Sequence, residues 1–493
     1  MAKKKNDNKN KVYLEFIGNN ADGVTGSSIF VQFYDSYLER NYNILLELGL
    51  MQGKSPVECY KANMNVLNRI DAKSLDVVFL QHLHGDHSLL LPALYRKGFE
   101  GNIFTTKESK FCATSMFEDG YNINKQDIKL LISKGIKAKP YYEEKDIPRT
   151  VLNMDAVELE KEYTLTPNIS FMFIPNRHIL GSSSLILTFT DENNNKHKLF
   201  YSSDLGNVKF DKYFINQKQE PIDSCNVGIY ESTYSSKERI VIDKKLRNKD
   251  VYNLHQELRY TLLEKKGNCL FPAFSLDRTP NLLYIVKQIL DSDKDLKDIQ
   301  VYVDGKLTNG LLDNYSVICK DENKEKINEL LQWENLIRIR AFKQTETVLQ
   351  NKKPKIIFSS SGMCTNGHVI YYLERLLSKP ENTIIFSGYS SSDSPATKIK
   401  NNAKLPKENK KIVKLNQDST VVQNCDVLEM HSFSSHIMRD DLIHYITATN
   451  QQKCVLVHGD SREELAEDLK IEFAKMNKTT KVIVPHIGDK ILF

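Results

Sequence analysis

Paired cysteines, a secretory signal and a membrane-length apolar run are all missing from this 493-residue chain. Its eight cysteines are scattered and none stands in a C-x-x-C pair, which is typical of reduced thiols. Because there is neither a signal peptide nor an apolar run near the length of a membrane span, we expect a soluble cytoplasmic protein without a membrane partner. The lack of internal repeats at solenoid periods excludes a repeat architecture.

An excess of charge of one sign is missing too. The formal net charge is only +5, so overall charge does not indicate nucleic-acid binding, and any such indication must come from local charge. The first eleven residues carry five lysines and show no apolar periodicity, which predicts a disordered basic tail over residues 1–11. The length predicts two or three domains, and the apolar fraction of 40% is enough for ordinary cores.

Three histidines and an aspartate stand within QHLHGDH, residues 81–87. The run LDVVFL before this stretch predicts a buried strand, and HSLLLPALYRKG after it predicts a helix. If the strand continues to its end, His82 and His84 point to the same side. Gly85 then permits a sharp turn, and Asp86 caps the helix. Imidazoles suit zinc and a carboxylate suits zinc or a harder divalent ion, so the stretch predicts ligands for two metal ions.

Further ligand candidates recur at strand ends far along the chain. His178 follows the strand SFMFIP in a loop before Gly181, and Asp204 ends the strand HKLFYSSD. Candidates that recur in this way predict a metal site on one edge of a sheet.

The pattern of apolar runs changes near residue 222. Runs such as NVGIYE, NCLFPAF and IQVYVD alternate with helical stretches such as RTPNLLYIVKQIL. This alternation predicts a separate α/β domain with a mainly parallel sheet. Residues 398–414 hold seven lysines and one glutamate, and we expect this run to contain the boundary that ends the domain.

Four motifs, in chain order, resemble the successive metal motifs of the metallo-β-lactamase fold: HLHGDH, RHILGS, SSDLG and HSFSSH. ESTY (Glu231–Tyr234), SSSGMCTNGH and the late FSSH resemble the β-CASP branch of that fold, which contains RNase J and the endonuclease subunit of the cleavage and polyadenylation specificity factor. The resemblance implies an αββα sandwich that is split by an inserted α/β cap domain, with the active site between them. The sandwich would comprise residues 12–221 and 409–493, and the inserted β-CASP domain residues 222–408.

The resemblance also implies a ligand set for each of two zinc ions, with manganese as an alternative metal. The first set is His82, His84 and His178; the second is Asp86, His87 and His436; Asp204 bridges the two. The catalytic residues would be Asp86, Asp204, Glu231 and His436, with Glu231 orienting a ligand or the attacking water.

Three further positions correspond to family motifs outside the predicted ligand set. Where the family usually has an aspartate in an ILIDCG-like strand end, NILLELGL has Glu47, which we expect to hydrogen-bond a metal ligand. Where eukaryotic relatives have a histidine shortly after GY, this chain has Lys398. We expect Lys398 to bind substrate rather than to donate a proton, because an ammonium is a poor acid at neutral pH. His458, in VLVHGD, resembles the family's HGE, and we expect it to partner a ligand.

The implied function is metal-dependent hydrolysis of phosphodiester bonds in single-stranded RNA, internally or from a 5′ end, by a hydroxide that two zinc ions activate. Predicted substrate contacts are the backbone at Ser360, Ser361 and Gly362, just before a helix, and the Lys398 ammonium. Three alternatives stay open: a DNA substrate, a small-molecule hydrolase for thioesters or lactones, and an inactive scaffold. Monomer and homodimer stay open as well.

Overall fold

The computed structural model describes residues 10–210, 212–215, 217–388, 390–391, 394–406, 409, 412–416 and 419–493. The chain forms two compact units. The first comprises Met1–Val208, Gln217–Arg239 and His436–Phe493, and the second comprises Lys209–Asn216 and Ile240–Ser435. Residues 1–9 of the predicted tail lie outside the described residues. Among the described helices, none is long and apolar enough to cross a membrane.

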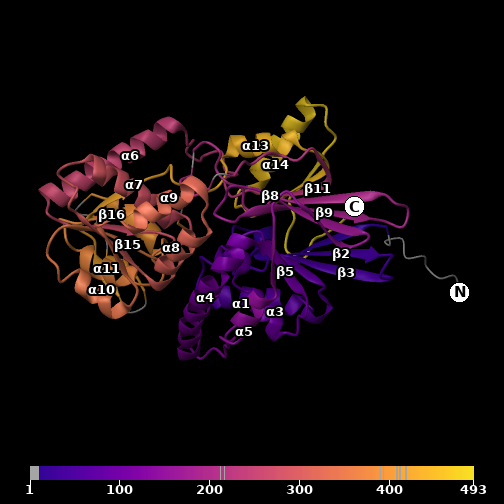
Figure 1. Ribbon diagram of the computed structural model, residues 1–493, viewed down its shortest axis with the longest axis horizontal. Helices are drawn as coiled ribbons and strands as arrows, with labels where there is room; N and C mark the ends of the chain where they lie inside the picture. Colours follow the sequence, from indigo (N-terminus) through magenta and orange to yellow (C-terminus); the bar gives the residue numbers. More distant parts are fainter. Residues whose placement is uncertain are drawn as a thin grey trace. The chain divides into compact units, whose positions relative to one another are not determined.

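The first sheet of the first unit starts as an antiparallel meander and continues with parallel strands (Figure 1). Its strands, in sheet order, are β22 (Lys490–Leu492), β1 (Val12–Phe16), β2 (Ile29–Asp35), β3 (Arg40–Leu46), β4 (Val77–Phe79), β5 (Asn102–Thr106) and β6 (Met154–Val157). Buried and partly exposed residues alternate along β1 and β2, so only one face of these strands joins the core. β22 pairs with β1, which brings residues from opposite ends of the sequence together at one edge.

The second sheet of the first unit also combines antiparallel and parallel strands. Its strands, in sheet order, are β21 (Lys481–Ile483), β20 (Asn450–Val457), β11 (Ser224–Glu231), β10 (Lys196–Tyr201), β9 (Ser183–Thr190), β8 (Ile169–Pro175) and β7 (Glu162–Thr166). β7 to β10 are antiparallel neighbours, whereas β10, β11, β20 and β21 run parallel.

The two sheets pack face to face around a core rich in phenylalanine. The rings of Phe33 and Phe189 lie 5.1 Å apart, and those of Phe79 and Phe171 lie 4.8 Å apart, each pair joining one sheet to the other. Helices cover both outer faces (Figure 1). They are α1 (Pro56–Arg69), α2 (Gly85–Ser88), α3 (Leu91–Arg96), α4 (Lys107–Ser133) and α5 (Asp146–Leu152) beside the first sheet, and α13 (Arg439–Ala448) and α14 (Arg462–Lys475) beside the second; short turns are η1 (Asn19–Ala21) and η2 (Ala72–Ser74). The predicted αββα sandwich is therefore confirmed.

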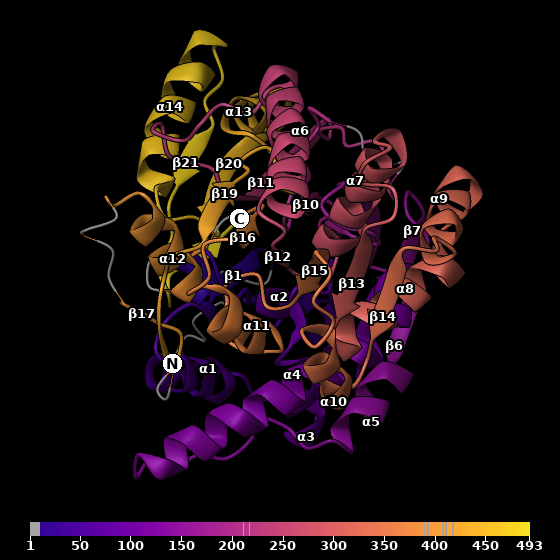
Figure 2. The ribbon, with the colours of Figure 1, turned by 90° about the vertical axis from the view of Figure 1, so that its left-hand side faces the viewer.

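The second unit is built on a six-stranded sheet in which every pair of neighbours is parallel. In sheet order the strands are β14 (Leu336–Ile339), β13 (Gln300–Asp304), β15 (Lys355–Ser359), β12 (Cys269–Pro272), β16 (Thr383–Phe386) and β19 (Asp426–Glu429). Helices flank the sheet (Figures 1 and 2). They are α6 (Lys244–Arg259), η3 (Tyr260–Glu264), α7 (Arg278–Ser292), α8 (Lys306–Ile318), α9 (Asp321–Leu331), α10 (Phe342–Val348), α11 (Val369–Leu376) and α12 (Pro395–Ala403), and a ribbon is formed by β17 (Ile412–Lys414) and β18 (Thr420–Val422).

Apart from the short segment Lys209–Asn216, the second unit begins and ends later than the predicted inserted domain, 222–408. The prediction places β11 in the inserted domain, but β11 pairs in parallel with β10 and β20 of the first unit. Residues 409–435 belong to the second unit, where β19 extends the parallel sheet beside β16. Buried parallel strands look alike in both units, so an apolar run does not show which sheet it joins. Residues 407, 408, 410 and 411 of the lysine-rich run lie outside the described residues.

Candidate metal centre

Strand ends of the first unit carry the candidate ligands. β3 and β4 are parallel neighbours, as are β10, β11 and β20, and β8 runs in the same direction as β10 because both are antiparallel to β9. Parallel strands bring their carboxyl ends to the same edge of a sheet. Each of the six strands ends at, or up to three residues before, one polar residue of the centre: Glu47, His82, His178, Asp204, Glu231 and His458.

The QHLHGDH stretch reaches the centre through a short turn of helix. α2 begins at Gly85, with His84 as its N-cap residue and Asp86 in the first turn. The prediction that Asp86 caps the helix is therefore wrong. Leu83 stands between His82 and His84 and is buried in the core. The two histidine rings lie near each other, with their centroids 5.0 Å apart. The stretch thus delivers two imidazoles before the helix, and a carboxylate and a third imidazole within it.

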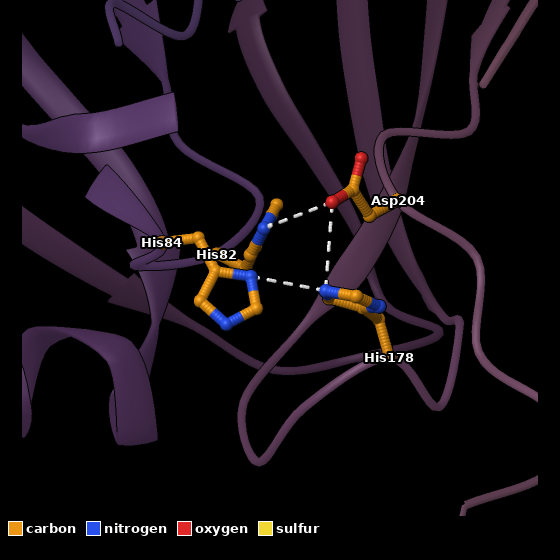
Figure 3. Close-up of side chains that lie close together, drawn as sticks. All are labelled: His82, His84, His178 and Asp204. Carbon is orange, nitrogen blue, oxygen red and sulfur yellow. Dashed lines mark hydrogen bonds and ion pairs between the residues drawn. The ribbon is translucent and has the colours of Figure 1, made fainter. Parts of the chain in front are cut away.

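One group of ligands consists of three histidines and one aspartate (Figure 3). His178 Nε2 lies 3.0 Å from His84 Nδ1 and 3.5 Å from Asp204 Oδ2. His82 Nε2 lies 3.6 Å from the same carboxylate oxygen. Imidazole and carboxylate donors in a compact group are the ligands that zinc takes at catalytic sites. The structure thus brings together the four residues predicted around the first ion.

A second group lies on the other oxygen of Asp204. His87 Nε2 is 3.4 Å and His458 Nδ1 is 3.5 Å from Asp204 Oδ1. His458 Nε2 also approaches His87 Nε2 to 3.3 Å and Asp86 Oδ2 to 3.4 Å. Because Asp204 turns one oxygen to each group, its carboxylate is placed to bridge two ions.

His436 differs from its predicted role, because the group that contains Asp86 and His87 includes His458 instead. His436 Nε2 comes only to 4.0 Å of Asp204 Oδ2, on the side of the first group. Its Nδ1 lies 3.1 Å from Glu231 Oε1 and 3.2 Å from Oε2. The sheet topology explains why His458 joins this group. His458 directly follows β20, which pairs in parallel with β11, so it lies at the same edge of the sheet as Glu231. A histidine directly after a strand, as in VLVHGD, was the sequence signal that could have placed His458 in this group.

Glu231 is held rigidly beside His436. Its carboxylate accepts hydrogen bonds from the backbone N–H of Leu205, at 2.6 Å, and of Thr233, at 3.2 Å. Its own N–H donates to Ser202 Oγ, and the residue is almost fully buried. A buried carboxylate fixed in this way selects the ring tautomer of its histidine and orients the ring.

Glu47 is fully buried and organises the second group from behind. Its Oε2 lies 2.6 Å from His87 Nδ1 and accepts a hydrogen bond from the Tyr201 hydroxyl, also at 2.6 Å. Its Oε1 accepts a hydrogen bond from Ser203 Oγ at 2.7 Å, and Ser203 Oγ in turn lies 3.2 Å from His82 Nδ1. The carboxylate therefore touches one ligand directly and reaches another through a hydroxyl. This is the contact expected of Glu47 from the sequence.

Electrostatics favour cation binding at both groups. Burial lowers the pKa of His82 and of His178 well below the ordinary value, and lowers the pKa of His84 to about 4, so these rings are neutral and their lone pairs are available. Burial alone would lower the pKa of His87 too, but the negative charges of Asp204 and Glu47 raise it well above the ordinary value. The same negative charges favour a metal cation beside His87.

Two buried atoms support the same conclusion. Within the described part of the chain, His82 Nε2 and Asp204 Oδ1 have no hydrogen-bond partner. A buried polar atom that lacks a partner costs about 1–3 kcal/mol, and a coordinated ion would remove that cost. The donor set, its charge and these two atoms all fit divalent metal ions.

Comparison with known families agrees with this geometry. The Beta-Casp domain model matches residues 279–399. A model described as the Zn-dependent metallo-hydrolase RNA specificity domain matches residues 420–485, which include His436 and His458. The chain belongs to the β-CASP family of the metallo-β-lactamase fold.

Several known proteins resemble this β-CASP chain over most of its length. An RNase J-like protein of Methanocaldococcus jannaschii is 28% identical over 434 residues, covering 85% of this chain and 90% of the relative. Ribonuclease TTHA0252 of Thermus thermophilus is 23% identical over 429 residues, covering 86% and 89%. Transcription termination factor FttA of Methanocaldococcus jannaschii is 24% identical over 401 residues, covering 79% of this chain and 59% of the factor.

A solved structure shares the fold of this β-CASP chain. The crystal structure of a protein of unknown function from Enterococcus faecalis V583 aligns with a TM-score of 0.53 and 15% identity. The alignment covers 98% of this chain and 100% of the other.

The predicted substrate contacts of the β-CASP chain all lie in the second unit. Ser360, Ser361 and Gly362 follow β15, but α11 begins only at Val369, so they do not directly precede a helix. The N–H of Ser361 donates to the carbonyl of Asn366 within the loop. Lys398 lies on α12 with an exposed side chain.

Proposed function

We propose that this β-CASP chain is a metal-dependent ribonuclease that hydrolyses phosphodiester bonds of single-stranded RNA. The observation that carries the proposal is one carboxylate, Asp204, whose two oxygens face two groups of candidate metal ligands, with the Glu231–His436 pair beside it. Such a paired site is typical of enzymes that cleave phosphate esters. The names of two relatives, an RNase J-like protein and a ribonuclease, favour RNA over other phosphodiesters.

Two divalent ions, which we propose to be zinc with manganese as the alternative, would supply Lewis acidity toward the phosphate and lower the pKa of a water molecule to about 7. The residues that would hold the first ion are His82, His84, His178 and Asp204. Those for the second are Asp86, His87, Asp204 and His458. Glu47 keeps the His87 ring in the orientation that turns Nε2 toward Asp204.

His436 is the residue best placed to move a proton. Glu231 contacts its Nδ1, which leaves Nε2 as the atom turned toward Asp204. A carboxylate on the far nitrogen fixes the ring tautomer and holds the other nitrogen in place for proton transfer. We propose that His436 delivers a proton to the leaving oxygen of the cut strand. This proposal removes the need for an acid at Lys398.

The loop at Ser360, Ser361 and Gly362 and the Lys398 ammonium remain proposed contacts for RNA phosphates. Lys398 is exposed, and a compact cation of this kind suits a phosphate. Lys398→Ala should weaken RNA binding and lower its salt dependence by about one phosphate contact, with little change in turnover at saturating RNA. Filter binding at several salt concentrations measures this, with the exposed Lys324→Ala of α9 as the control. A loss of turnover at unchanged affinity would assign the acid role to Lys398 after all.

Cleavage of end-labelled RNA tests the function directly. Single-stranded RNA with a 5′-hydroxyl, monophosphate or triphosphate is incubated with the purified chain, with and without chelator, beside DNA of the same sequence and a thioester. We expect chelator-sensitive cleavage of RNA, and the labelled products distinguish internal cuts from 5′ removal. Asp204→Asn should lower the rate about 100-fold or more, whereas Asp440→Asn, at an exposed position of α13, should not. Turnover of only DNA or only the thioester would refute the RNA assignment.

A further inference from the structure

A groove on the helical side of the first sheet carries none of the metal ligands. It has a volume of about 840 Å³ and is lined by residues of α1, the ends of α3 and α4, and residues 135–141. All of these segments belong to the first unit, and Figure 1 shows α1, α3 and α4 together on the outer side of that sheet. A volume of this size is large enough to take several side chains of a bound peptide.

The floor of the groove is aliphatic. Met64 and Leu67 of α1 line it together with Ile132 and Ile136. The Ile132 side chain, one of these four, is 56% exposed to solvent. A patch of exposed apolar surface that is framed by polar residues often marks an interaction site. The floor therefore offers a seat for large apolar side chains.

The tyrosines of the groove are already engaged with each other and with the loop. The Tyr60 and Tyr141 rings stack with centroids 5.7 Å apart and 24° between their planes. The Tyr60 hydroxyl accepts a hydrogen bond from the N–H of Lys139, and the Tyr141 hydroxyl accepts one from Asn63 Nδ2. No other aromatic ring lines the groove in the part of the chain that the structure describes. A row of nucleobases would need free aromatic faces, so this floor favours aliphatic contact.

The rim is basic. Arg96, Lys97, Lys137 and Lys139 line it, and no carboxylate does among the described lining residues. Arg96 pairs with Glu143 at 3.2 Å, and Lys97 Nζ donates to the Leu67 carbonyl. Lys137 and Lys139 are exposed and form no ion pair with any described residue. The ammonium groups of Lys137 and Lys139 are therefore available to an anionic ligand.

We propose that the groove binds an acidic peptide segment of a partner protein, with leucine or phenylalanine side chains on the floor and carboxylates on Lys137 and Lys139. Charge complementarity with the rim and the aliphatic floor together select this occupant. Residues 1–9 of this chain do not fit, because they carry four lysines and one aspartate. The site is separate from the metal centre and does not depend on the substrate of the enzyme.

Selection from a library of random peptides tests the proposal without a known partner. The full, metal-loaded chain serves as bait, and binders that also bind the triple variant Ile132→Ser, Lys137→Glu, Lys139→Glu are discarded. We expect the retained peptides to be rich in aspartate or glutamate and to carry two or more large apolar residues. Retained peptides that are basic, or no enrichment over the triple variant, would overturn the proposal.

Fluorescence anisotropy with one retained peptide then separates floor from rim. Ile132→Ser alone should weaken binding about 10-fold, and Lys137→Glu with Lys139→Glu at least as much, with loss of salt dependence. Lys470→Glu, an exposed lysine of α14, should leave affinity unchanged, and all variants should keep the RNA cleavage rate of the parent. Displacement of the peptide by oligouridine but not by an unlabelled acidic peptide would mean that the groove binds nucleic acid, and the proposal would be wrong.

Discussion

At the scale of single residues, Glu47 shows how this centre is held in shape. Its backbone adopts a left-handed conformation with φ of 58°, which residues other than glycine rarely take. That conformation accompanies three short contacts to Tyr201, Ser203 and His87. The longer glutamate side chain therefore meets the ligands where the family usually has an aspartate, with hydroxyl donors filling the rest of its hydrogen-bonding capacity.

Glu47→Gln tests this arrangement. The amide keeps the shape but loses the charge that orients His87, so we expect RNA turnover to fall about 10- to 100-fold and metal affinity to fall with it. Glu39→Gln is a matched control, because Glu39 has a similar φ of 53° but is exposed. Unchanged rate and affinity in Glu47→Gln would show that the carboxylate only fills space.

The ligand residues show what a sequence can and cannot assign. The spacing of QHLHGDH and the strand ends before His178 and Asp204 predicted groups that the structure brings together. The sequence-based assignment gave His436 the ligand position and His458 the position beside a ligand, whereas the structure groups His458 with Asp86 and His87. Their roles depend on which sheet neighbour each one follows, and that pairing joins segments more than two hundred residues apart.

At the scale of elements, the fit of α2 against the segment after β3 positions the second group. Leu48 N–H donates to the His87 carbonyl and Leu50 N–H to the Gly85 carbonyl, so the two segments meet backbone to backbone. A Cβ on Gly49 would lie 1.7 Å from the Asp86 carbonyl oxygen. Only glycine permits this approach, and it sets the place of both Asp86 and His87.

Gly49→Ala should therefore displace α2 and weaken the second group. We expect a lower melting temperature, loss of metal and loss of RNA cleavage together, because the clash is with backbone rather than with a side chain that can turn away. Gly23→Ala is the control, since a Cβ there meets its nearest atoms at ordinary distances of 3.9 and 4.0 Å. A Gly49→Ala chain with the parent's metal content would contradict this view of the element.

The elements also mark the limit of sequence-based domain assignment. The alternation of apolar runs with helices predicted a mainly parallel sheet, and the second unit has one. The prediction placed β11 in the inserted domain, because β11 is a largely buried, apolar strand like β12 of the inserted unit. Which partner a buried strand takes depends on long-range packing rather than on its own residues.

At the scale of the whole molecule, the buried histidines link stability to pH once metal is removed. His82, His84 and His178 have a pKa below the ordinary value of about 6.5 in the folded state, so they bind protons more readily when the chain unfolds. Their contribution to stability is present above that value and is lost as pH falls. The pKa of His87 and that of His458 are raised instead, so between pH of about 6.5 and 4 these two stay protonated in both states and add no slope.

The chelated protein should therefore melt at a lower temperature at pH 5 than at pH 6, a range in which His87 and His458 add little slope. Because ligands must be deprotonated to bind metal, added zinc should raise the melting temperature more at pH 7 than at pH 5.5. Differential scanning calorimetry with and without chelator measures both effects. A melting temperature of the chelated protein that rises as pH falls from 6 to 5 would contradict the assignment of neutral, buried imidazoles.

The central claim is a centre of two ions in which His458 is a ligand and His436 is not. Metal analysis of the purified chain beside His458→Ala and His436→Ala tests it most directly, with RNA cleavage measured on the same samples. We expect about two ions per chain in the parent and in His436→Ala, and about one in His458→Ala, with cleavage strongly reduced in both variants. Loss of an ion from His436→Ala, with both ions kept in His458→Ala, would contradict the account.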